Sequence, residues 1–176
     1  MTSTGSEKPA ANDKIEKLMA DLESKEGVRR MEARHQLVET GKAAIPYLIK
    51  ALNSKKQRVR WEATKTLGAM QAPEAATALV KKLMDDSFEV QWLAAEGLIA
   101  LKRAAVHPLL KALTTHFDNL DLRQGAHHIL HALERENLLD EKTLVVLDEL
   151  RNIEPLEPFP GVAEAALNAL AENKPE

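Results

Sequence analysis

Apolar residues recur along the chain at the spacing of a helix face, and this pattern repeats. Each copy has an alanine followed by a leucine four residues later, and successive alanines lie 30 to 32 residues apart. Residues at this spacing share one face of a helix. A small residue there lets another helix pass close over it, where a larger one would overpack the contact. The pairs are Ala33/Leu37, Ala63/Leu67, Ala94/Leu98 and Ala126/Leu130.

A second apolar stretch that ends in leucine follows each of the first three helices. These stretches end in alignment at Leu48–Leu52, Leu79–Leu83 and Leu109–Leu113. Prolines 46, 73 and 108 lie near their starts, where a missing backbone N–H costs little. A period of about 30 residues with two helices in each unit is typical of stacked helical repeats. The pattern therefore predicts an all-α, right-handed α-solenoid of about four to five two-helix repeats.

The boundaries of the array follow from the same alignment. Repeats are expected near residues 27–53, 56–84, 87–115 and 119–152, with a half-repeat at 160–172. Residues 1–12 are polar and should form a disordered tail, because they bury too little apolar surface to offset chain entropy. Asp13 can cap a first helix that covers the end of the array. We thus expect one repeat domain over residues 13–172.

The fourth repeat departs from the pattern of the others. Its second helix is expected over Lys142–Leu150, followed by a stretch with three prolines that cannot lie inside a helix. Val162, Ala166 and Leu170 then repeat the opening spacing. This last segment is expected to begin a further repeat and to close the array.

Composition narrows the classes of function. The chain has no cysteine, which excludes disulfides and thiolate metal sites and makes a reducing, cytoplasmic compartment the expectation. No stretch approaches the roughly 18 apolar residues of a membrane span, and no signal peptide is evident. A net charge of −3 gives no overall attraction to nucleic acid. We expect a monomer that associates with neither membranes nor nucleic acid.

The repeats resemble the HEAT repeat family, and in particular the short, bacterial-type HEAT-like repeats of phycobilisome lyase subunits. The resemblance is good over Gly27–Leu133 and looser over Val162–Leu170. It implies an armadillo-like helical scaffold whose second helices line a concave surface. The matching residues are Val59-Arg60, Ala63, Leu67-Gly68, Pro46-Tyr47-Leu48, Leu52, Pro108-Leu109 and Leu113.

Three lysines occupy one position of the second helices, two residues before the last leucine. They are Lys50, Lys81 and Lys111. On a concave surface they would form a basic ladder with Tyr47 and His107 nearby, where an acidic peptide or a phosphate backbone could dock. The alternative is an ordinary solvated helix face.

Two tryptophans occupy one position of the first helices. Trp61 and Trp92 each lie two residues before the core alanine, about 160° from it around the helix. Exposed in a row, they would form a binding stripe, since tryptophan is enriched at interaction hot spots. Alternatively, each ring lies flat along its helix and covers the neighbouring repeat and the stem of Arg60.

Other charged groups suggest weaker hypotheses. Residues 41–70 carry a charge of +6 and residues 134–176 a charge of −7, which could steer a partner or simply keep the surface soluble. His127 and His131 have a spacing that can share a metal, with His128 and Glu134 nearby. We favour a surface cluster, because the three histidines lie on the outer helix face. No metal or cofactor is expected.

No catalytic signature is present. The chain lacks a cysteine nucleophile, a glycine-rich phosphate loop and a Ser-His-Asp arrangement, so it is not expected to be an enzyme. The favoured function is a non-catalytic protein–protein interaction scaffold or adaptor that binds another protein on its concave, lysine-bearing face. Two alternatives stay open: an accessory subunit of an enzyme, similar to bilin lyases, and a HEAT-like nucleic-acid binder, similar to DNA glycosylases built of such repeats.

Overall fold

The computed structural model describes residues 7–151 and 159–172, and every regular element within these ranges is a helix. In chain order they are α1 (Glu7–Asp21), α2 (Gly27–Thr40), the 3₁₀ turn η1 (Gly41–Ala44), α3 (Ile45–Ala51), α4 (Gln57–Met70), η2 (Pro73–Ala75), α5 (Ala76–Lys82), α6 (Phe88–Ala100), α7 (Arg103–His116), α8 (Leu120–Arg135), α9 (Glu141–Arg151) and α10 (Phe159–Glu172).

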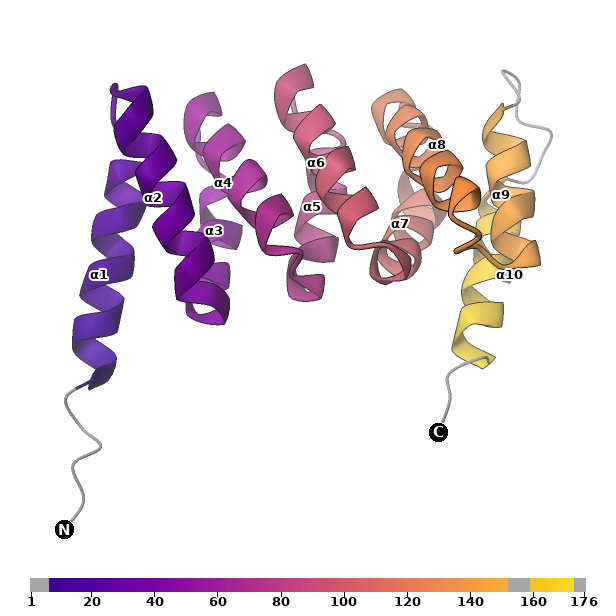
Figure 1. The fold of residues 1–176 in the computed structure, drawn as a ribbon. Helices are drawn as coiled ribbons and strands as arrows, with labels where there is room; N and C mark the ends of the chain where they lie inside the picture. Colours follow the sequence, from indigo (N-terminus) through magenta and orange to yellow (C-terminus); the bar gives the residue numbers. More distant parts are fainter. Residues whose placement is uncertain (1–6, 152–158, 173–176) are drawn as a thin grey trace, which may run out of the picture.

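The helices form two layers that run side by side along one axis (Figure 1). In the first layer α2, α4, α6, α8 and α9 contact one another in succession. In the second layer α1 contacts α3, α3 contacts η2, which leads into α5, and α5, α7 and α10 follow. Helices of the two layers pair as α1/α2, α3/α4, α5/α6, α7/α8 and α10/α9. This stack confirms the predicted α-solenoid.

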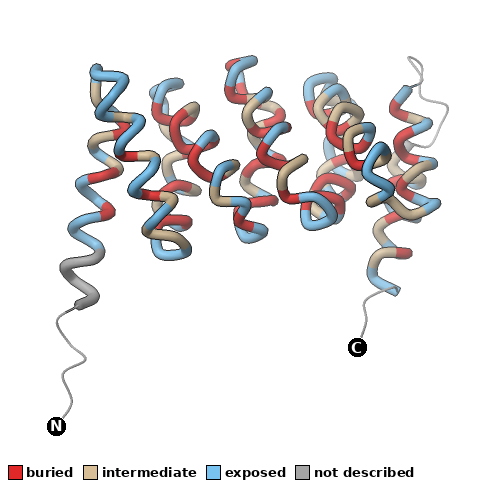
Figure 2. The backbone as a smooth tube through the Cα atoms, viewed as in Figure 1, coloured by how far each residue is buried: buried red, intermediate tan, exposed pale blue. Residues whose placement is uncertain are grey.

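The alanine–leucine register predicted from the sequence forms the core between the layers. Ala33, Ala63, Ala94 and Ala126 are all buried, as are the four leucines that follow them. One hydrophobic cluster runs from Ile15 to Ala166, and buried segments face one another along the whole array (Figure 2). Each helix pair therefore covers the apolar face of the next, as expected of stacked repeats.

Two helices approach each other closely where α4 crosses α6. A Cβ added at Gly68 or at Gly97 would lie 3.2 Å from the Cα of the other glycine, which is closer than ordinary van der Waals contact. The two backbones meet here without a side chain between them. A side chain at either position would therefore require the facing backbone to shift by a few tenths of an ångström.

The start of α1 differs from the prediction. The helix begins at Glu7, and Asp13 lies inside it, so the expected cap at Asp13 is wrong. Pro9 falls in the first turn, where a missing N–H breaks no hydrogen bond, and helix formation can therefore start upstream of it. The disordered tail predicted for residues 1–12 thus overlaps a helix from Glu7, and residues 1–6 lie outside the described ranges.

The packing of the last two helices also differs from the prediction. The segment predicted as the second helix of the fourth repeat is α9, and it packs beside α8 in the first layer. The place next to α7 is taken by α10. The buried face of α10 consists of Ala163, Ala166 and Ala169, small residues that allow it to approach α7 closely. The proline-rich stretch before α10 falls mainly on residues 152–158, outside the described residues.

Candidate interaction surfaces

The three predicted lysines lie on adjacent helices of the second layer, and we call them the lysine column. Lys50 is on α3, Lys81 on α5 and Lys111 on α7, and all three are exposed. The leucines two residues before and two residues after each lysine are buried. Residues two apart lie on opposite sides of a helix, so the column points away from the core. None of the three forms an ion pair with a described residue.

A groove lies beside the column, between α3 and α5. It has a volume of about 300 Å³ and is lined by both apolar and charged side chains. Tyr47, one helix turn before Lys50, is half-buried and packs against the core rather than standing free. The column therefore borders a surface that could take both charged and apolar side chains. The groove is lined by Ile49, Leu52, Asn53, Glu74, Thr77, Ala78, Lys81 and Lys82.

The two tryptophans lie in the first layer and differ in exposure. The ring of Trp61 is half-buried between two cations, with the Arg34 guanidinium 5.7 Å and the Lys65 ammonium 4.6 Å from its centroid. Trp92 is 49 % exposed, and its ring centroid lies 5.2 Å from that of His128 on α8. Each ring thus contacts a side chain of a neighbouring helix in its own layer.

Two exposed apolar residues of the first layer escaped the sequence analysis. Phe88 is 71 % exposed and Leu120 is 61 % exposed, and they are the first residues of α6 and α8. Both stand six residues before their core alanine, one helix turn before the tryptophan position. This shared spacing could have identified the two residues from the sequence. It was not apparent because the equivalent residues of the earlier repeats, Gly27 and Gln57, are not apolar side chains.

A network of buried ion pairs connects neighbouring repeats, and sequence reasoning missed it. Glu62, 1 % exposed, accepts hydrogen bonds from Arg30 and Arg34 of α2. Arg60 donates to both carboxylate oxygens of Asp85, at 2.9–3.1 Å, and also pairs with Asp86. The sequence feature that could have indicated the network is Arg60 of the Val59-Arg60 pair, which is buried in the fold.

The network changes the charges assigned to the surface. Hydrogen bonding to Asp85 raises the pKa of Arg60. Burial pushes the pKa of Asp85 upward, but hydrogen bonds from Arg60 and Lys82 outweigh it and leave that pKa lowered. Lys42 and Lys56 pair with Glu74 and Glu23. Three of the seven basic groups in residues 41–70 are therefore neutralised locally, and less positive charge is free to steer a partner than the sequence suggests.

The histidines of α8 do not converge on a common point. The His127 and His131 rings are stacked, with centroids 6.0 Å apart, whereas His128 turns toward Trp92 and Glu96. Burial and the nearby His131, Arg151 and His128 lower the pKa of His127. Among the described residues, no group of three or more metal-ligating side chains is close enough to hold an ion.

The fold defines the class of this protein as an α-solenoid of two-helix repeats. A family model described as HEAT repeats matches residues 15–98. The chain is also similar to the crystal structure of an engineered protein from the Northeast Structural Genomics Consortium, with 22 % identity over 97 % of this chain and 93 % of that chain, at a TM-score of 0.42. No curated protein matches the sequence. Within the described ranges, no helix has the length and apolar character needed to span a bilayer.

Proposed function

We propose that this protein is a non-catalytic scaffold that binds an acidic segment of another protein along the lysine column. The supporting observation is that Lys50, Lys81 and Lys111 occupy one repeat position on three adjacent helices, exposed and without ion pairs to described residues. HEAT repeats commonly present such rows of equivalent side chains on an extended surface. The proposal places the protein in the cytosol, as a monomer of the phycobilisome-lyase type of repeat.

The groove between α3 and α5 supports an extended partner rather than a single anion. Its apolar lining residues can bury a hydrophobic side chain, while Lys81, which also lines the groove, pairs with a neighbouring carboxylate of the partner. Each exposed ion pair contributes only about 0.2–1 kcal/mol. Three in a row act mainly by selecting the partner and by accelerating its association.

A charge-reversal experiment tests this surface. The probe is a fluorescein-labelled peptide in which glutamate and leucine alternate, with an equivalent glutamine–leucine peptide for comparison, and binding is followed by anisotropy. The triple variant Lys50→Glu, Lys81→Glu, Lys111→Glu should weaken binding of the acidic peptide at least tenfold, because each pairing becomes a repulsion. Binding by the natural protein should also weaken as salt increases from about 50 to 300 mM.

The control variant carries the same change of charge away from the column. Lys25, Lys55 and Arg135 are exposed, lie outside α3, α5 and α7, and form no ion pair with a described residue. Changing all three to glutamate should leave the affinity within about twofold, apart from a small long-range effect. If both triple variants weaken peptide binding equally, the lysine column is not the binding site.

The surface around Trp61 and Trp92 is the alternative binding site for the partner on the same scaffold. Trp61→Ala and Trp92→Ala change the first layer, whereas the lysine column lies on the second. If the tryptophan variant abolishes peptide binding and the lysine variant does not, the partner binds the first layer. If a 20-mer DNA duplex binds more tightly than the peptide, with a steep salt dependence, a nucleic-acid binder replaces the scaffold.

A further inference from the structure

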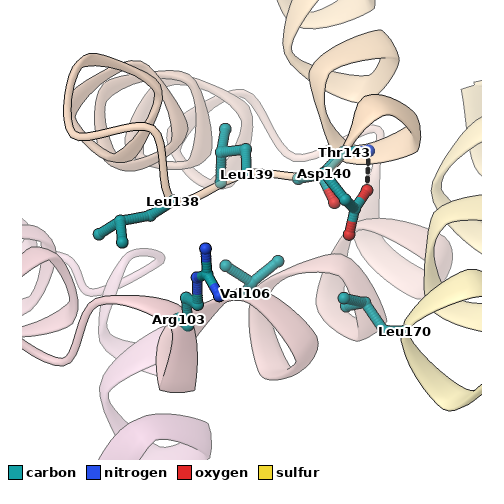
Figure 3. A pocket seen from close by; sticks show the side chains of 7 residues that line it. All are labelled: Arg103, Val106, Leu138, Leu139, Asp140, Thr143 and Leu170. Carbon is teal, nitrogen blue, oxygen red and sulfur yellow. Dashed lines mark hydrogen bonds between the residues drawn. The ribbon is translucent and has the colours of Figure 1, made fainter. Parts of the chain in front are cut away.

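A cavity of about 290 Å³ lies where the regular array gives way to α9 and α10 (Figure 3). It is surrounded by α7, the α8–α9 link, the first turn of α9 and α10. Its volume corresponds to about ten water molecules, which is within the range of small-ligand sites near the lower limit of about 300 Å³. It is lined by Arg103, Val106, Leu138, Leu139, Asp140, Thr143 and Leu170.

One wall of the cavity contains a buried hydroxyl group without a partner. Thr143 is 0 % exposed, and its Oγ1 forms no hydrogen bond with any described residue. Its backbone N–H is satisfied by Asp140 Oδ1, at 2.8 Å, which caps α9. A buried hydroxyl left unpaired costs about 1–3 kcal/mol. With no exposed surface, Oγ1 lies behind this wall, where a ligand in the cavity does not reach it.

Two opposite charges face the same space without pairing. Arg103, the first residue of α7, is exposed and forms no ion pair with any described residue. Its side chain extends into the cavity from the side opposite Asp140 and Thr143 (Figure 3). Asp140 likewise forms no ion pair within the described ranges. A guanidinium and a carboxylate that are separated across a cavity complement a ligand that carries both charges.

The remaining lining is apolar. Val106 and Leu170 come from α7 and α10, and Leu138 and Leu139 come from the α8–α9 link. Pockets of this kind use a few polar groups to orient a ligand and apolar side chains to bury it. The lining therefore calls for a ligand with a branched hydrocarbon side chain as well as two charges.

We propose that this cavity binds a free α-amino acid with a branched apolar side chain, such as leucine. Arg103 binds the ligand carboxylate, a pairing for which the planar guanidinium is well suited. Asp140 binds the ammonium group from the opposite side of the cavity. The hydrocarbon side chain packs on Val106, Leu138, Leu139 and Leu170. The site is separate from the lysine column, and the proposal does not depend on the scaffold function.

Methyl NMR on the full chain tests the proposal directly. L-leucine should produce saturable shifts in the methyl signals of Val106, Leu138, Leu139 and Leu170. Two further probes each lack one charge: 4-methylpentanoate has no ammonium group, and 3-methylbutylamine has no carboxylate. Each should bind at least about tenfold more weakly, because a charge-assisted hydrogen bond is lost. Equal binding of 4-methylpentanoate would overturn the assignment of an amino acid.

Variants assign the roles of the polar groups. Arg103→Gln and Asp140→Asn should each reduce leucine affinity at least about tenfold, and asparagine retains the ability to cap α9. Arg135→Gln, on an exposed residue outside the cavity, is the control and should change nothing. Thermal unfolding of each variant confirms that the fold is intact.

Two results would overturn the proposal. The first is the absence of saturable shifts up to about 10 mM leucine. This concentration is above the dissociation constant expected for specific binding of a ligand of this size. The second is leucine affinity that is unchanged in both Arg103→Gln and Asp140→Asn while the variants stay folded.

Discussion

The middle of the array and its C-terminal end are both built of paired helices, but they differ in how many of their buried polar groups form hydrogen bonds. In α4, the hydroxyls of Thr64 and Thr66 both donate to the carbonyl four residues earlier. In α9, Thr143 and Glu149 each keep a buried side-chain oxygen without a described partner, and no other described residue does so. In the middle of the array, these buried hydroxyls are hydrogen-bonded within their own helix. Where the chain leaves the pattern, an open cavity and unpaired groups remain.

The carboxylates in the links between repeats also differ in burial and in ion pairing. Asp85 lies in the link before α6 and is held by Arg60 and Lys82, with its side chain 3 % exposed. Asp118 lies in the next link, before α8, and is exposed. Similar links therefore carry carboxylates of very different structural importance, because only one is covered by the preceding repeat.

The largest expected effect breaks the buried pair in the middle. Asp85→Ala should lower the free energy of unfolding by about 2–4 kcal/mol, since it leaves the buried Arg60 without its main partner. Asp118→Ala should cost no more than about 0.5 kcal/mol. Urea unfolding followed by circular dichroism measures both. Similar losses in the two variants would contradict the contrast between the links.

The same carboxylate gives the middle of the array a dependence on acid. Because the pKa of Asp85 is lowered on folding, its stabilisation is present above the ordinary value of 3.8 and is lost as the pH falls through the lower, folded value. Between about pH 5 and pH 3, Asp85→Asn should therefore lose less stability than the natural protein. An identical acid profile would show that the carboxylate is not charged and paired in the fold.

A smaller effect of opposite sign distinguishes the two buried threonines. Thr143→Val removes an unpaired hydroxyl and should stabilise the unliganded protein by about 1 kcal/mol. Thr66→Val removes a hydroxyl that is hydrogen-bonded to the Glu62 carbonyl and should destabilise it by about 1 kcal/mol. Both threonines are 0 % exposed, so solvent exposure does not differ between them. Thermal melts that shift in the same direction would refute the comparison.

The smallest effect concerns His127, which lies among His128, His131 and Glu134 of α8 and Arg151 of α9. Its pKa is lowered on folding, so its contribution to stability is present above the ordinary value of 6.5 and is lost as the pH falls below it. His127→Gln should flatten the decrease of the melting temperature between about pH 7 and pH 5.5. A variant with an unchanged slope would assign that decrease to other groups.

Much of the fold was predictable because the repeat is visible in the spacing of apolar residues along each short segment of the chain. The burial of Ala63 and Leu67 follows from their spacing, and their copies in the other repeats fix which face each helix buries. The lysine column follows in the same way, because its position between buried leucines requires exposure. The partners of Arg60 and Glu62 were not predictable, because both look like ordinary surface charges until a neighbouring repeat covers them.

The sequence by itself determined the helices, their buried faces and the two-layer class, since periodicity of 3.6 residues is a local property of the chain. Only the tertiary structure decided which layer α9 and α10 occupy, because that choice depends on how α10 packs against α7, which is distant along the chain, and how α9 packs against α8. The cavity at their junction, with Arg103 and Asp140 on opposite sides of it, is the consequence. No pattern in the sequence brings those two residues together.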